Sequence, residues 1–312
     1  MQFWNMTKAK RRVAAFGAIS IIALALSACG STQPTAQNAQ KVTQDIEHIH
    51  GLGYSADGQT LYLATHRGLL KYRGGSFGQP LGNDDLMGFS MTAKAMYASG
   101  HPGDNRFKNP LGLVKLDGQG NVTPLAFYGS GDFHHMAASY KTGTIYVYAE
   151  EDMNGLKKGL NYTQDGGKTW HSVLGKGIDG EIESLAIAPD KDGIVAVGTP
   201  KGLFMSTDYG NHFQQMIEHL NTTGLSFDLK NSNTLYIGGY DKTPIFEAYD
   251  RVRKQALSIP LPFSDVDSVL FISENPSVHG ELTIGTYKTR VYQSANSGKQ
   301  WNTLIDKGMI KK

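Results

Sequence analysis

The stretch that decides the fold is TQDGGKTW at residues 163–170, a short polar turn that ends in a tryptophan. The aspartate oxygen in such a turn accepts backbone N–H groups, and the glycine adopts a conformation closed to other residues. The tryptophan then packs the following strand onto its neighbours. Two looser copies follow, STDYGNHF at 206–213 and SANSGKQW at 294–301. One copy would be weak evidence, but three copies indicate a chain built from repeated units.

Each turn shares a hydroxyl residue, an aspartate or asparagine, a glycine and an aromatic residue. We interpret these positions as structural and do not expect catalysis by Asp165 or Asp208. The shared positions are Thr163, Asp165, Gly167 and Trp170 in the first turn; Ser206, Asp208, Gly210 and Phe213 in the second; and Ser294, Asn296, Gly298 and Trp301 in the third.

A longer unit repeats around these turns. Each copy has two hydrophobic segments typical of strands, and a third strand follows in most copies. The copies begin at His50, Met87, His134, Glu183, Thr223 and Asp267. Their spacing of roughly 40–50 residues is the period of a four-stranded propeller blade. The sequence therefore predicts an all-β protein with six propeller blades; seven blades and an open β-solenoid are the alternatives.

The composition agrees with an all-β fold. Glycine supplies 37 of the 312 residues, well above the usual roughly 7%, as expected for many tight turns. Apolar residues make up 40% of the chain, which excludes a disordered protein. Charged residues make up only 19%, which argues against a coiled coil. The chain has a single long apolar run, which excludes a protein with several membrane spans.

That apolar run belongs to an N-terminal leader. Basic residues at 8–12 precede an apolar stretch at 13–26, which ends in the lipobox-like sequence Leu26-Ser27-Ala28-Cys29. We predict a lipoprotein signal peptide at 1–28, lipidation of Cys29 and anchoring on the extracytoplasmic face of the cell membrane. An ordinary secretory peptide is the alternative. The remaining predicted parts are a flexible tether at 29–44, a propeller at 45–306 and a basic tail at 307–312.

The leader also accounts for the positive charge of the chain. Its removal lowers the basic residues from 30 to 26 against 28 acidic ones, so the formal charge changes from +2 to −2. No basic run remains, and no nucleic-acid partner is expected. Cys29 is the only cysteine, which leaves the propeller without a disulfide or a thiolate metal ligand.

The turn motif resembles the Asp-box, or bacterial neuraminidase repeat, found in sialidase-like and sortilin-like propellers. The resemblance spans roughly residues 45–305 and is strongest to bacterial lipoproteins often labelled glycosylhydrolases. It implies a propeller fold and allows a glycoside hydrolase acting on envelope or extracellular glycans. The best carboxyl pair for such a reaction is Glu183 and Asp267, which open strands on one face. The Phe/Tyr-Arg-Ile-Pro motif of sialidases is absent, so a sialidase is not predicted.

Histidines occupy corresponding positions in the first three blades. In antiparallel blades, the start of the first strand and the end of the second lie at one end, opposite the repeated turns. His50, His66, His101, His134 and Met87 therefore converge on one mouth of the central channel. Imidazoles with a thioether suit copper, and imidazoles with carboxylates suit zinc. The alternative is a polar rim of histidines bonded to backbone and water.

A binding role needs no further special residues. Propellers present a rigid rim, and the mouth of the channel is where ligands usually bind. The primary interpretation is thus an anchored binding or assembly module for a glycan, a peptide or an envelope protein, with a metal site at the mouth. The glycoside hydrolase is the alternative.

Overall fold

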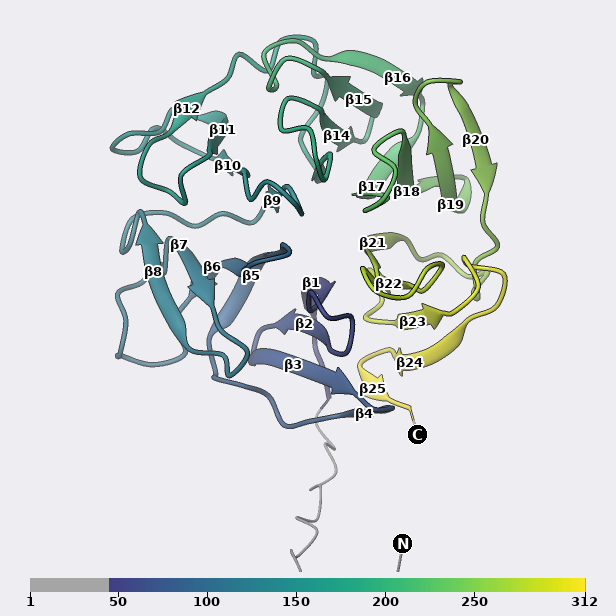
Figure 1. The fold of residues 1–312 in the computed structure, drawn as a ribbon, viewed down its shortest axis with the longest axis horizontal. Coiled ribbons are helices and arrows are strands. Elements are labelled where there is room, and N and C mark those ends of the chain that lie inside the picture. The colour runs from purple at the N-terminus through teal and green to yellow at the C-terminus, as the bar shows by residue number, and fades with distance from the viewer. Residues whose placement is uncertain (1–44, 312) are drawn as a thin grey trace, which may run out of the picture. The chain divides into compact units, whose positions relative to one another are not determined.

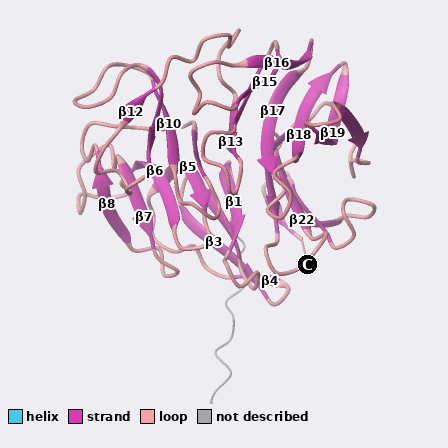
Figure 2. Cartoon of the chain, turned by 45° about the horizontal axis from the view of Figure 1, so that its top comes forward, coloured by secondary structure: helices cyan, strands magenta, loops and turns pink. Residues whose placement is uncertain are grey.

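The computed structural model describes residues 45–311, and in this part of the chain the secondary structure consists of strands and no helices (Figure 2). Among the described residues, no helix has the length and apolar character needed to cross a bilayer. The predicted signal peptide, Cys29 and the tether lie outside the described residues.

Six antiparallel sheets follow one another along the chain and form a ring (Figure 1). Blade 1 comprises β1 (Ile49–Tyr54), β2 (Leu61–Thr65), β3 (Gly68–Arg73) and β4 (Ser76–Phe77). Blade 2 comprises β5 (Asp85–Met91), β6 (Met96–His101), β7 (Leu113–Leu116) and β8 (Val122–Ala126). Blade 3 comprises β9 (Met136–Ala138), β10 (Ile145–Ala149), β11 (Gly159–Thr163) and β12 (His171–Ser172).

The second half of the ring has the same organisation. Blade 4 comprises β13 (Ser184–Ile187), β14 (Val195–Thr199), β15 (Gly202–Ser206) and β16 (Gln214–Glu218). Blade 5 comprises β17 (Asn221–Phe227), β18 (Thr234–Asp241), β19 (Thr243–Asp250) and β20 (Gln255–Ser258). Blade 6 comprises β21 (Val269–Glu274), β22 (Leu282–Thr286), β23 (Val291–Ser294), β24 (Asn302–Asp306) and β25 (Met309–Ile310). The all-β, six-bladed prediction is confirmed.

The hydrophobic core explains why the ring closes. A sheet with two apolar faces must bury both, and each blade does so against its two neighbours. The buried side chains form six clusters, one at each junction between neighbouring blades. The cluster between blades 6 and 1 joins Leu52 and Leu63 to Val291 and Ile305. The open solenoid is therefore excluded, because its end units would lack this sixth junction.

Polar contacts reinforce the junction between the first and last blades. The Tyr54 hydroxyl lies 2.6 Å from Thr283 Oγ1, and Asn275 Nδ2 donates to the Gly58 carbonyl at 2.9 Å. The Ile46 N–H donates to the Gly308 carbonyl at 3.0 Å. The two ends of the described chain are thus joined through both side chains and backbone.

The three repeated turns have one hydrogen-bond pattern, and they join the third and fourth strands of blades 3, 4 and 6. In the first, Thr163 Oγ1 donates to Asp165 Oδ1 at 2.8 Å and accepts the Gly167 N–H at 2.9 Å. Asp165 Oδ1 also accepts the Thr169 N–H at 2.9 Å. Gly167 has a φ of +95°, a backbone conformation that glycine adopts at low cost and other residues do not. The other turns repeat these bonds through Ser206 and Asp208, and through Ser294 and Asn296.

Replacing Asp165 by alanine is expected to lower the thermal midpoint by roughly 2–4 °C, because the turn N–H groups lose their acceptor. Asn296 accepts the same bonds in the third turn, so Asp165→Asn is expected to cost clearly less. Thermal unfolding followed by circular dichroism measures both, with Lys168→Ala as the control in the same turn. An equal decrease in the thermal midpoint for the alanine and asparagine variants would show that Asp165 does not stabilise the turn through these hydrogen bonds.

The C-terminal residues differ from the predicted basic tail. Lys307 and Gly308 have φ of +49° and +80° and form a tight turn. The chain then returns as β25, with Ile310 paired to Ile305 and Met309 to Asp306. The lysines at 307 and 311 suggest a basic tail by composition, but the two adjacent apolar residues 309 and 310 extend the sheet of blade 6.

Candidate metal centre

Irregularities in the innermost strands orient side chains at the mouth. The pairing register shifts at one residue near the start of four first strands, at His50 in β1, Met87 in β5, Thr223 in β17 and Leu270 in β21. Such β-bulges insert an unpaired residue and redirect its side chain. Three of the six predicted blade starts are therefore bulge residues.

His50, His66 and Asp85 form the tightest group of candidate metal ligands in the described chain. His50 Nε2 lies 3.3 Å from His66 Nε2, and His66 Nδ1 donates to Asp85 Oδ1 at 2.7 Å. One candidate ligand atom from each residue lies within 4.8 Å of the others. The three residues come from β1, the turn after β2 and the first position of β5, so blades 1 and 2 build the group together.

The hydrogen bond to Asp85 sets the tautomer of His66. A carboxylate only accepts, so the proton of neutral His66 is on Nδ1 and the lone pair is on Nε2, facing His50. Burial, and then the neighbouring His66, lower the pKa of His50 to about 4. At neutral pH His50 is therefore uncharged, as a metal-ligating imidazole must be.

His101 and His134 form a second group around Asp132. Asp132 Oδ2 lies 3.2 Å from His101 Nε2 and 2.9 Å from His134 Nε2. Burial alone would raise the pKa of Asp132, but the hydrogen bonds and charges of His134 and His101 outweigh it and lower that pKa. The hydrogen bond to Asp132 raises the pKa of His134 in turn.

The four predicted histidines thus lie at the mouth in two pairs, each with a carboxylate that the sequence did not single out. Met87 is half-buried on β5 and is not among the described residues that line the channel cavity of about 200 Å³. His48, which was not among the predicted ligands, has its ring 5.2 Å from that of His66. His135, also not predicted, lines the channel cavity together with His134.

A larger cavity of about 680 Å³ lies at the same mouth and is lined by residues from blades 3, 4, 5 and 6. This volume is within the range of small-molecule sites. Tyr240 and Tyr287 provide aromatic surface, and Glu183 and His135 line both this cavity and the central channel. A ligand in the larger cavity would therefore lie next to the channel that His50 and His134 also line.

The two predicted catalytic carboxyl groups have different environments in this cavity. Burial, and then the neighbouring Glu181, raise the pKa of Glu183. Asp267 is 3% exposed, and its carboxylate accepts hydrogen bonds from several groups. It accepts from Thr286 Oγ1 at 2.8 Å and from the Ser268 and Lys288 N–H groups at 2.9 and 3.0 Å.

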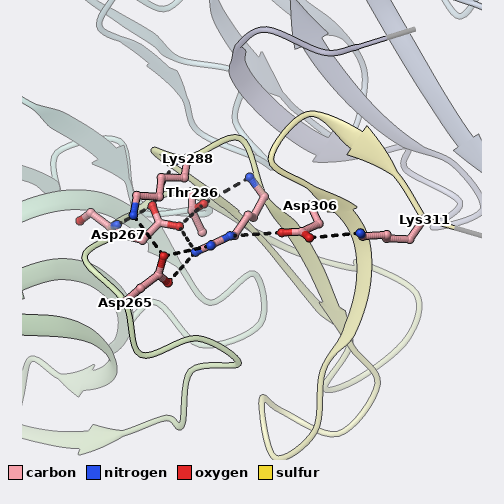
Figure 3. Close-up of polar contacts among 8 residues, drawn as sticks. Asp265, Asp267, Thr286, Lys288, Asp306 and Lys311 are labelled. Carbon is pink, nitrogen blue, oxygen red and sulfur yellow. Dashed lines mark hydrogen bonds and ion pairs between the residues drawn. The ribbon is translucent and has the colours of Figure 1, made fainter. Parts of the chain in front are cut away.

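Arg290 completes the surroundings of Asp267. Its guanidinium lies 3.0 Å from Asp267, 2.7 Å from Asp265 and 3.4 Å from Asp306. Figure 3 shows these three carboxylates converging, with Lys288 and Lys311 at the edges of the network. The network joins the segment before β21 to β24 and fixes Asp267 in blade 6.

Comparisons with known proteins agree on the fold. No family model and no curated protein matches the chain. Among solved structures, the GH74 enzyme of Niastella koreensis has a TM-score of 0.58 at 14% identity, covering 86% of this chain and 46% of that one. A chain of a nidogen/laminin complex has a TM-score of 0.60 at 12% identity, with 80% and 95% covered.

A gluconolactonase from Xanthomonas campestris has a TM-score of 0.55 at 14% identity, with 78% of this chain and 84% of that one covered. The chain spans less than half the length of the GH74 chains it matches. Identities this low show the fold alone. The chain is a six-bladed β-propeller, with structural neighbours among GH74 enzymes and other propellers.

Proposed function

We propose that this protein is a lipid-anchored, extracytoplasmic binding module whose channel mouth holds a divalent metal ion. The observation that carries the metal is the convergence of His50, His66 and Asp85 within 4.8 Å. Two imidazole ligands bound to one ion at about 2.1 Å in tetrahedral geometry lie about 3.4 Å apart. The two Nε2 atoms are already 3.3 Å apart, so little rearrangement is needed.

The donor set favours zinc over copper. A carboxylate accompanies the two imidazoles, and the orientation of a histidine by a carboxylate is a common arrangement around zinc. Copper would be favoured by a thioether, but Met87 is not among the residues that define the group. Asp85 either orients His66 or binds the ion itself.

The cavity of about 680 Å³ provides the place for the organic ligand of the module. A peptide, a glycan or a segment of an envelope protein fits its mixture of tyrosines and polar groups. The geometry supports binding better than glycoside hydrolysis. Glu183 has the raised pKa of a general acid, but its predicted partner Asp267 is held by Arg290 and by three further hydrogen bonds.

The metal proposal is tested by zinc titration of the full-length protein in detergent, in competition with a chromophoric chelator. We expect tight, saturable binding that chelators reverse. Magnesium is expected not to compete, because it prefers oxygen ligands. Zinc binding no tighter than that of an unrelated propeller without clustered histidines would refute the proposal.

A further inference from the structure

We propose that the cavity of about 680 Å³ at the channel mouth is a docking site for a basic peptide, whose lysine or arginine side chain binds Glu181 and Glu183. This inference rests on the proposed binding role and names the class of ligand, and it does not depend on the metal ion. The occupant is a segment of another polypeptide. Its positively charged side chain enters the cavity, and its neighbouring residues cover the apolar rim.

The two glutamates of the cavity wall lack partners in the described part of the chain. Within residues 45–311, the carboxylates of Glu181 and Glu183 form no hydrogen bond and no ion pair. Glu183 is half-buried, and burial and then Glu181 raise its pKa while no neighbouring group lowers it. An unpaired carboxylate in such a position is costly, and a ligand that brings a positive charge removes this cost.

The other charged groups of the wall are neutralised by their neighbours. Lys288 Nζ lies 3.1 Å from Asp265, and Asp267 lies 3.0 Å from the Arg290 guanidinium. Burial lowers the pKa of His135, so this imidazole is uncharged at neutral pH. The two glutamates therefore give the cavity a net negative charge that complements a basic ligand.

The backbone around the cavity is fixed by hydrogen bonds. The Glu183 N–H donates to the Gly198 carbonyl at 2.9 Å, and the next residue, Ser184, pairs with Gly198 in the sheet of blade 4. In blade 6, the Tyr287 N–H donates to the Ser268 carbonyl at 2.9 Å. A wall held in this way loses little conformational freedom when a ligand binds.

Aromatic and apolar side chains provide the second half of the site. Tyr240 is half-buried, whereas Tyr287 and Val266 are 72% and 69% exposed, and all three line the cavity. Aromatic faces attract ammonium and guanidinium groups, and exposed apolar side chains around a cavity are typical of interaction sites. A small free amine has too little surface to cover this rim, which favours a peptide.

Other classes of ligand match the cavity less well. A neutral glycan would cover Glu183 with hydroxyl groups, which compensate for part of the lost hydration of a carboxylate but bring no opposite charge. An acidic ligand would bring like charges together. A basic peptide matches both the charge of the glutamates and the apolar rim.

The test is isothermal titration calorimetry of the full-length protein in non-ionic detergent with a metal chelator present. The probe is an acetylated and amidated hexapeptide with a lysine on each side of a phenylalanine, and its counterparts carry glutamine or glutamate in place of lysine. We expect saturable binding of the lysine peptide that weakens as salt is added. The glutamine peptide should bind at least about tenfold more weakly, and the glutamate peptide more weakly still.

Substitutions in the wall assign this preference to the glutamates. Glu183→Gln is expected to weaken binding of the lysine peptide by at least about tenfold and to leave binding of the glutamine peptide unchanged. Glu181→Gln, at an exposed position, should cost less than about fivefold. Glu218→Gln is the matched control, because Glu218 is an exposed glutamate on β16 of the same blade and does not line the cavity. Circular dichroism checks that each variant is folded.

The outcomes separate this inference from the proposed function. Equal affinity for the lysine and glutamine peptides, or a lysine-peptide affinity that Glu183→Gln leaves unchanged, would overturn the basic ligand and keep a binding role. Binding of n-butylamine as tight as that of the lysine peptide would overturn the assignment to a peptide. No binding of any of the three peptides would overturn the inference as a whole, while the zinc titration tests the metal site independently.

Discussion

Replacing His50 and His66 together by alanine is expected to weaken zinc binding at their position by more than roughly 100-fold. Each imidazole is a direct ligand in the proposed site, and the loss of a partner that only orients a ligand already costs about 10–100-fold. Asp85→Asn is therefore expected to have a smaller effect, within that range, if Asp85 orients His66. Competition titration against a chromophoric chelator measures all three affinities.

The controls for this prediction come from the same molecule. His212→Ala removes an exposed histidine from the repeated turn of blade 4 and should leave the zinc isotherm unchanged. The thermal midpoint of the double variant should stay near that of the wild type without metal. An unchanged zinc isotherm in the double variant would show that His50 and His66 are not zinc ligands.

Replacing Arg290 by methionine is expected to destabilise the fold by about 3 kcal/mol, the largest effect on stability that we predict. Arg290 is 6% exposed, and its removal leaves the buried Asp267 carboxylate without its counter-charge. Denaturant unfolding measures the change. Lys311→Ala, which removes a half-exposed partner of Asp306, should cost less than about 1 kcal/mol.

A second substitution separates charge burial from packing at this network. Adding Asp267→Asn to Arg290→Met should recover part of the lost stability, because the buried charge disappears together with its partner.

Acid should weaken the native network as well. Hydrogen bonds from Arg290 and Lys288 lower the pKa of Asp265, so its stabilisation is present above the ordinary carboxyl pKa. That stabilisation is lost as the pH falls through the lowered value. An Arg290→Met variant as stable as the wild type would contradict this account.

The fold could be predicted from the sequence because its signals are local and repeated. The turn at 163–170 needs its own hydroxyl, carboxylate and glycine, and all three bond within the turn. The period between copies then gives the size of one blade, and the number of copies gives the number of blades. The strand at 309–310 was missed because the two flanking lysines suggest a solvated tail, whereas Gly308 allows the chain to turn back.

The site was less accessible to sequence reasoning. Counting strand starts identified His50 and His134 but passed over Asp85 and Asp132, which lie two residues before Met87 and His134. The bulges at His50 and Met87 shift the register, and the spacing of the repeated units does not reveal this shift. Asp267 was predicted as a catalytic residue from its position alone. Its contact with Arg290, 23 residues away along the chain, depends on tertiary structure.

The most direct test of the metal site is X-ray absorption at the zinc edge of the loaded full-length protein. We predict a first shell of nitrogen and oxygen at about 2.0–2.1 Å with the outer scattering of imidazole rings. That imidazole scattering should decrease in the variant lacking His50 and His66. A shell of oxygen alone, or a spectrum that the variant leaves unchanged, would contradict the assignment of the ion to these histidines.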